Sequence, residues 1–583
     1  MATTMIHTPK LFPIPYLSSF FDDDDIHTIH NPNNVDAELL NWALKYDYIL
    51  RFGISYTEQS SKWFCIPDSS RLPESELINL LTVHTYDIDL QSNLHENRKM
   101  DTVKLVDFVP QDLKSLSNYL QAITPFVELP ELQEYLNKYA IPVPADFPGQ
   151  YYVRKAITLK RLYGDDIDIP NQILHLVPFL GPLHVSLNTR ESTIKIYHQF
   201  FNLLYKKIFK KTKNLSLTPP PWLVNYLLYL SRSGWMIIRD TVINKFGIQK
   251  NLEYHTFLDL LDNIVLATLD IYAILFREGH FEEYLETIFR LWTIMKRFGR
   301  KNYDKIMIAF ISDVLYWQSI EHPMYNILSE NLQEFNEYFV ENFHSLIRRH
   351  TVGKNYNPEG LRRDAMFIDS QRHNNDFMGP FINTKKYPYT KKNIDVMVKQ
   401  TALFLVEFFQ KIWSNSTSPQ HVPQPTTGSI QSTGHKFFVL NEIMKIGTLP
   451  TGYRTKSPPN PNIFCDAKDC NINIEIDQLQ LYGKVLICGH GYHNECFQKM
   501  GFKCHYCLDY LVDGINLLSS SYNDRLESQA TKTDQIELEN PDELDSSPND
   551  DDDDNFDEFN SNLPSNNLNI NIRAALIKLQ QGK

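Results

Sequence analysis

The sequence is poor in glycine, with 21 glycines among 583 residues. Collagen-like chains and flexible glycine linkers need far more glycine, so the sequence excludes both classes. No apolar run reaches the roughly 18 residues that a membrane span needs, and the amino-terminal stretch has no basic region followed by a long apolar segment. We therefore predict no membrane span and no secretion signal, and expect an intracellular protein of the nucleus or the cytoplasm.

Two motifs of nucleophilic and phosphate chemistry are also missing. The sequence contains no Gly-x-Ser-x-Gly turn, which would position a serine nucleophile, and no glycine-rich loop that would cradle a phosphate. The motifs therefore identify no catalytic residue.

Apolar residues are ample and negative charge is concentrated near one end. Hydrophobic residues make up 42% of the chain, which is enough for a sizeable core. The formal net charge is −13, and residues 524–558 contain 15 acidic but 2 basic residues, with consecutive aspartates at Asp550–Asp554. The rest of the chain is close to neutral, so it lacks the strong positive field of a typical nucleic-acid-binding protein.

Composition and apolar periodicity divide the chain into segments and predict an α+β fold. The predicted segments are a loose lead-in (1–35), a helical amino-terminal region (36–140), a mainly helical body with a small sheet (141–413), a Ser/Thr/Pro/Gln-rich linker (414–462), a cysteine module (463–520), an acidic disordered tail (521–565) and a short carboxy-terminal helix (566–583). Within the body, residues 175–187 favour a buried strand and turn, and residues 151–159 have strand-like composition. Helical spacing covers residues 194–209, 222–230, 257–276, 281–298, 303–320 and 328–349.

Cysteine is almost confined to one short region, because Cys65 alone lies outside residues 465–507. Cys65 follows two aromatic residues and is expected to be a buried apolar residue. In a reducing compartment, clustered cysteines bind metal more often than they form disulfides. The candidate ligands, in chain order, are Cys465, Cys470, Cys488, His490, His493, Cys496, Cys504 and Cys507. Thiolate and imidazole are ligands that zinc prefers, four to each ion, so these residues predict two zinc ions.

The order and spacing of these ligands resemble a RING-type zinc finger of the variant with two central histidines. The string LICGHGYHNECF (486–497) is similar to the core of that family. The resemblance implies interleaved sites, one formed by Cys465, Cys470, His493 and Cys496 and the other by Cys488, His490, Cys504 and Cys507. It also implies recognition of protein partners, with a possible ubiquitin ligase activity that positions a ubiquitin-conjugating enzyme. A zinc knuckle of another type and a non-catalytic scaffold remain open as alternatives.

Four strings of the body resemble a transposase-like domain of fungal genomes, which is similar to the ribonuclease-H fold. They are ADFPGQYYVRK (145–155), PFLGPLHVSLN (178–188), DLLDN (259–263) and ENFHSLIRR (341–349). The resemblance implies that Asp146 and Glu341 match the first and last metal-binding carboxylates. Pro182 stands where the middle aspartate is expected, and His184 is either a residual ligand or a core residue. The implied alternative function is therefore a nucleic-acid-binding protein without an intact catalytic site.

Two basic clusters bear on that alternative. Lysines at 206, 207, 210, 211 and 213 form one cluster, and lysines at 385, 386, 391 and 392 form the other. Each predicts either contact with phosphates, a nuclear address, or a solvated helix end.

Overall fold

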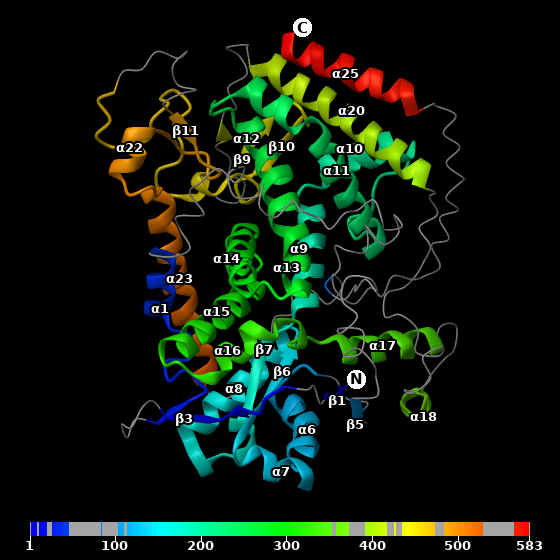
Figure 1. Ribbon diagram of the computed structural model, residues 1–583, viewed down its shortest axis with the longest axis vertical. Helices are drawn as coiled ribbons and strands as arrows, with labels where there is room; N and C mark the ends of the chain where they lie inside the picture. Colours follow the sequence, from blue (N-terminus) through cyan, green and yellow to red (C-terminus); the bar gives the residue numbers. More distant parts are fainter. Residues whose placement is uncertain are drawn as a thin grey trace.

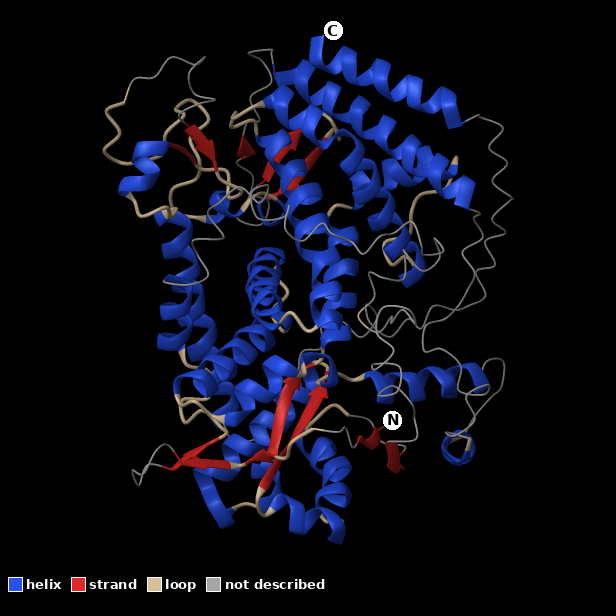
Figure 2. Ribbon diagram, viewed as in Figure 1, coloured by secondary structure: helices blue, strands red, loops and turns tan. Residues whose placement is uncertain are grey.

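The computed structural model describes residues 2–7, 11–19, 26–45, 83, 103–109, 113–351, 357–371, 391–416, 425–426, 434–472, 483–528 and 565–581. Helices predominate in these residues and the sheets are small (Figures 1 and 2). This confirms the predicted α+β class with a mainly helical body. In the part of the chain that is described, no helix combines the length and hydropathy needed to cross a membrane.

The strands form short sheets of two or three members. The strands are β1 (Ala2–His7), β2 (Ile14–Pro15), β3 (Leu17–Ser19), β4 (Ile26–Thr28), β5 (Val103–Val109), β6 (Tyr139–Ala145), β7 (Leu176–Leu180), β8 (Pro425–Thr426), β9 (Gly434–Phe437), β10 (Glu442–Lys445), β11 (Gly483–Val485) and β12 (Gly491–His493). Their orders are β1-β5, β3-β4, β2-β6-β7, β10-β9-β8 and β11-β12, and β6-β7 is the parallel pair among them.

The helices supply most of the core. They are α1 (Ala37–Ala43), α6 (Leu116–Val127), α7 (Pro130–Leu136), α8 (Phe147–Tyr163), α9 (Pro182–Ile196), α10 (His198–Phe209), α11 (Pro221–Phe246), α12 (Leu252–Leu258), the π-helix η6 (Asp259–Asp270), α13 (Ile271–Glu278), α14 (Phe281–Phe298), α15 (Tyr303–Ser319), α16 (Pro323–Glu330), α17 (Tyr338–Thr351), α18 (Pro358–Ser370), α20 (Lys391–Ser416), α22 (Asn494–Lys499), α23 (His505–Glu527) and α25 (Ser565–Gln581). Trp235, Trp292 and Trp317 are fully buried among them.

The parallel strands β6 and β7 each lead directly into a helix. Ala145 pairs with Leu180 at the carboxyl end of the pair. Asp146 then caps α8 by accepting a hydrogen bond from the Gly149 amide at 3.0 Å. The strand-like composition of residues 151–159 is therefore misleading, because they lie in the buried middle of α8. An acidic cap followed by proline in the first turn favours a helix and outweighs the strand propensity.

The predicted helix over residues 328–349 is interrupted. The helix α16 ends at Glu330, and α17 begins at Tyr338. Between them, the side chain of Asn336 accepts a hydrogen bond from the Tyr338 amide at 2.7 Å, which fixes a new helix start. The break places Glu337 beside the carboxyl end of β7, next to the first turn of α9.

The structure also differs from the sequence interpretation at residues 1–35 and 414–462. Ile14 and Ile29, in the stretch interpreted as loose, are buried in the main core. The hairpin β9–β10, in the stretch interpreted as a linker, buries Phe437. In the turn of this hairpin, the amides of Phe438 and Val439 donate hydrogen bonds to the carboxylate of Glu253 at 2.5 and 3.3 Å. In both stretches, isolated apolar residues pack into the main core and attach these polar segments to the body.

The helix α23 connects the cysteine module to the rest of the molecule (Figure 1). It begins in the module and packs against α1, α8 and α15. Residues 521–527, which the sequence assigns to the acidic tail, complete this helix. The module is therefore continuous with the body through a packed helix.

Candidate metal centre

A short hairpin and two helix starts bring the cysteine module together. Cys488 and His490 lie in the turn between β11 and β12, and His493 ends β12. Gly489 adopts a φ of 93°, which favours glycine, and the Leu486 amide closes the turn on the His490 carbonyl at 2.8 Å. Cys504 and Cys507 lie at the start of α23. Each ligand pair is therefore set by a local turn or a helix terminus.

The structure brings the candidate ligands into two groups that could each hold a metal ion. One group is Cys465, Cys470, His493 and Cys496, and the other is Cys488, His490, Cys504 and Cys507, with the ligand atoms of each group within 4.8 Å of one another. These are the two interleaved sets that the RING resemblance implies.

The distances within the second group suit a tetrahedral ion. The Nδ1 atom of His490 lies 3.5, 3.4 and 3.7 Å from the sulfurs of Cys488, Cys504 and Cys507. In a tetrahedron with zinc–sulfur bonds of about 2.3 Å, neighbouring ligand atoms are about 3.8 Å apart. Three sulfurs and one ring nitrogen form a donor set consistent with zinc.

The first group is arranged in the same way. The Nδ1 atom of His493 lies 3.3 Å from the sulfur of Cys470 and 4.0 Å from that of Cys496. Burial and the neighbouring thiols of Cys470 and Cys465 raise the pKa of Cys496 to about 12. Crowded thiols resist becoming thiolates together, whereas a bound dication favours their deprotonation. A bound dication would therefore supply the positive charge that lets these neighbouring thiols lose their protons.

Residues outside the module orient one of the ligands. The Nε2 atom of His490 lies 3.0 Å from the Ser457 carbonyl, so a ring that donates there presents Nδ1 to the sulfurs. The Gly452 amide donates to the Cys488 carbonyl at 2.9 Å. A Cβ atom at Gly452 would lie 2.4 Å from that oxygen, so only glycine fits. These contacts come from residues 414–462, and main-chain contacts of this kind leave no pattern in the sequence.

A lysine of the body supports the loop that carries the first ligand. The Lys250 Nζ atom donates to the carboxylate of Asp466 at 2.6 Å and to the carbonyls of Asn460 and Ile463 at 2.8 and 3.0 Å. Asp466 also accepts a hydrogen bond from the Gly491 amide at 2.7 Å. Burial lowers the pKa of Lys250, although Asp466 opposes this shift. Both side chains are 6% exposed, so the pair anchors the cysteine module on the body.

A second cluster of titratable residues lies at the carboxyl ends of β6 and β7. His184 Nδ1 lies 3.1 Å from Glu337 Oε1, and His184 Nε2 lies 3.7 Å from Glu341 Oε1. Burial alone would lower the pKa of His184, but its hydrogen bond to Glu337 and the charges of Glu337, Glu341 and Asp146 outweigh burial and raise it to about 9. Glu337 also accepts from the amides of Leu183 and His184 at 3.0 and 3.2 Å. An imidazolium thus lies between two carboxylates at the start of α9.

This cluster bears on the transposase resemblance. Asp146 and Glu341, the two carboxylates that the resemblance selects, both act on His184. However, Asp146 caps α8, and within the described residues only the two Cys/His groups bring three or more metal-binding atoms within 4.8 Å of one another. The geometry supports a salt-bridged turn, and it provides no support for transposase chemistry. Sequence reasoning missed Glu337, which lies just before α17, in the interruption of a predicted helix.

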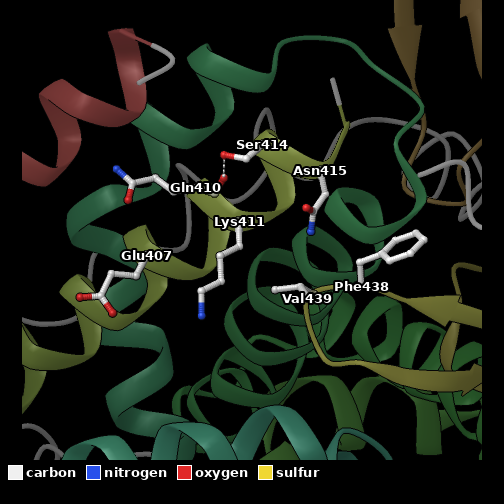
Figure 3. Close-up of a pocket in the computed structure, with 7 residues that line it drawn as sticks. All are labelled: Glu407, Gln410, Lys411, Ser414, Asn415, Phe438 and Val439. Atoms are coloured by element: carbon white, nitrogen blue, oxygen red, sulfur yellow. Dashed lines mark hydrogen bonds between the residues drawn. The ribbon is translucent and has the colours of Figure 1, made fainter. Parts of the chain in front are cut away.

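The remaining residues that the sequence singles out are the two lysine clusters and Cys65. Lys207, near the end of α10, pairs with Glu407 at 3.3 Å, and Lys210 has a left-handed φ of 51°. Lys391 and Lys392 begin α20, whereas lysines 385 and 386 and Cys65 lie outside the described residues. A surface pocket of about 560 Å³ lies between α20 and the β9–β10 turn (Figure 3). Its lining residues are Glu407, Gln410, Lys411, Ser414, Asn415, Phe438 and Val439, none of which belongs to either Cys/His group.

Comparison with protein families, with curated proteins and with solved structures finds no match for this chain. The RING resemblance therefore depends on ligand order, spacing and the geometry described above.

Proposed function

We propose that this protein binds two zinc ions and uses the RING-like module to recognise a protein partner, the partner class being a ubiquitin-conjugating enzyme. The observation that carries the proposal is the pair of interleaved groups, each with three cysteines and one histidine. Metal bound there would hold a segment with little core of its own in one conformation. A ligase of this kind performs no covalent step itself and accelerates transfer by positioning the charged enzyme.

An exposed aromatic residue supports the recognition role. Phe502 is 47% exposed and has a left-handed φ of 57°, which a non-glycine residue rarely adopts. Its amide donates to the Phe497 carbonyl at 2.9 Å, and its ring meets the Phe497 ring edge-on at 5.7 Å. Backbone strain persists where the surrounding structure enforces it, and it is concentrated at functional sites. The metal framework therefore presents Phe502 as a fixed apolar contact.

The test is ubiquitin transfer by the full chain with a panel of conjugating enzymes. The proposal expects chain formation with at least one enzyme, loss of activity in Cys488→Ser together with part of the zinc, and loss of activity in Phe502→Ala with the zinc retained. Leu517→Ala is the matched control, because Leu517 is 72% exposed on α23 and lies outside both ligand groups. A zinc-loaded chain that neither binds nor activates any enzyme of the panel contradicts the ligase assignment.

The basic run at the end of α10 favours a second candidate function, nucleic-acid binding by the body. Lys207, Lys210 and Lys213 are exposed there. The expected result is salt-dependent DNA binding whose slope becomes shallower when Lys210 and Lys211 are changed to alanine. Absence of binding, or binding independent of salt, excludes this candidate.

A further inference from the structure

The carboxy-terminal helix α25 packs on α11 and α20 (Figure 1). Leu568, Ile572 and Leu579 are 3%, 4% and 1% exposed, whereas Ile570 and Ile577 are 64% and 51% exposed. The buried positions are separated by four and seven residues, the spacing that places side chains on one stripe of a helix. The helix is thus amphipathic, and only its stripe enters the core.

The polar contacts of α25 use its main chain. The Gln410 side-chain amide donates to the Ala575 carbonyl at 3.2 Å, and Figure 3 shows Gln410 extending from α20 toward the carboxy-terminal helix. The Lys245 Nζ atom donates to the Gln580 carbonyl at 2.9 Å and lies 4.3 Å from the centre of the Trp413 ring. A cation at the carboxyl end of a helix is favoured by the helix dipole. Because both donors reach carbonyl oxygens, they would serve any helix with a matching apolar stripe.

Covalent connection favours this docking. In the sequence, residues 529–564 separate α25 from α23. Because α25 belongs to the same chain as its docking surface, docking is intramolecular and a modest intrinsic affinity suffices. The surface that receives α25 is formed by the two long helices α11 and α20, and Lys245 and Gln410 on them donate hydrogen bonds to it. Other proteins likewise bind an amphipathic helix between helices of the receptor.

We propose that the surface between α11 and α20 is a docking site for an amphipathic helix, and that α25 occupies it as the chain's own displaceable ligand. A competing helix would carry apolar residues at positions i, i+4 and i+11, matching Leu568, Ile572 and Leu579. This inference stands independently of the metal module and of its proposed partner.

The first experiment uses the full chain carrying Ile572→Asp, with Ile570→Asp as the matched control on the exposed face. The probe is a fluorescent peptide of residues 565–583, followed by anisotropy. We expect the Ile572→Asp chain to bind the peptide at least about tenfold more tightly than the wild-type and Ile570→Asp chains, because a buried charge weakens docking of the internal helix. Equal binding by all three chains, or none by any of them, overturns the proposal.

A second measurement decides the case in which Ile572→Asp does not fold. A protease site placed between residues 529 and 564 of the wild-type chain is cleaved, and the labelled peptide is added. The proposal expects the freed fragment to exchange with the label, and an unlabelled Ile572→Asp peptide to compete at least about tenfold less well than an Ile570→Asp peptide. Retention without exchange, or aggregation on loss of the fragment, would show that α25 is a permanent part of the core.

Discussion

Individual residues outside the cysteine module contribute to its geometry. Lys250 places a buried ammonium group between a carboxylate and two carbonyls, next to the ligand Cys465. Ser457 and Gly452 set the orientation of the His490 ring and of the Cys488 carbonyl. The cysteine module therefore depends on partners up to 216 residues away in the chain.

Replacing Lys250 by methionine is expected to destabilise the full chain by about 3–5 kcal/mol, because it leaves the buried Asp466 carboxylate without its counter-charge. The measurement is urea unfolding at constant zinc. The double variant Lys250→Met/Asp466→Leu should regain part of the loss, because it removes the unpaired charge as well. Lys138→Met, at an exposed lysine, is the control and should change stability by less than about 0.5 kcal/mol. A Lys250→Met chain as stable as this control would contradict the anchoring role.

The eight candidate ligands could be predicted from the sequence because each pair is local and its spacing follows from the reach of a turn. Lys250 and Ser457 could not, because their contacts join distant segments and several of them end on main-chain carbonyls. The position of Glu337 could not be predicted for a different reason. The apolar periodicity of residues 328–349 continues across the break that Asn336 creates, so the sequence indicates one uninterrupted helix there.

At the scale of elements, α23 joins the cysteine module to the helices α1, α8 and α15 of the body. Its first turn contains Cys507, and its last turns are held by Lys155 of α8, which donates to the Arg525 carbonyl at 3.0 Å and to the Ser528 hydroxyl at 3.3 Å. Lys155 is fully buried. The helix thus begins in one of the Cys/His groups and has its carboxyl end held by a buried lysine.

Lys155→Met should release the carboxyl end of α23 and cost roughly 1.5–3 kcal/mol, the usual contribution of a hydrogen bond from a charged donor. Hydrogen exchange should accelerate over residues 519–527, whereas exchange in α14 and the zinc content should stay unchanged. Uniform acceleration in both helices would instead indicate global destabilisation and count against the capping role.

Element boundaries show where sequence reasoning succeeded. The helix predicted over residues 281–298 has the bounds of α14, because its apolar stripe is regular and Gly299 ends it with a φ of 73°. Residues 151–159 were misassigned because local composition conflicts with the Asp146 cap, and the cap determines the outcome.

At the scale of the whole molecule, buried histidines give stability a dependence on pH with two limbs. Burial lowers the pKa of His30 to about 3 and those of His255 and His322 to about 4. Their unfolded pKa is about 6.5, so stability is lost as pH falls below that value. His184 has the opposite sign, because its folded pKa is about 9. Its contribution is complete below pH 6.5 or so and is lost as pH rises through 9.

Together these four histidines contribute a dome-shaped term to the profile of unfolding free energy against pH, with its maximum near pH 6.5. His184→Gln should flatten the limb between pH 6.5 and 9 while leaving the acid limb in place. Denaturant unfolding at fixed zinc and ionic strength measures both limbs. An unchanged alkaline limb in His184→Gln would mean that the ion pairs with Glu337 and Glu341 do not contribute to stability.

The central claim is that two ions, each held by three sulfurs and one nitrogen, order the module on the body. Metal analysis of the full chain combined with zinc-edge X-ray absorption tests it most directly. The account predicts two zinc ions per chain and an average shell of three sulfurs at about 2.3 Å and one nitrogen at about 2.0 Å. A folded chain that carries no metal, a single ion, or a shell dominated by oxygen and nitrogen would contradict it.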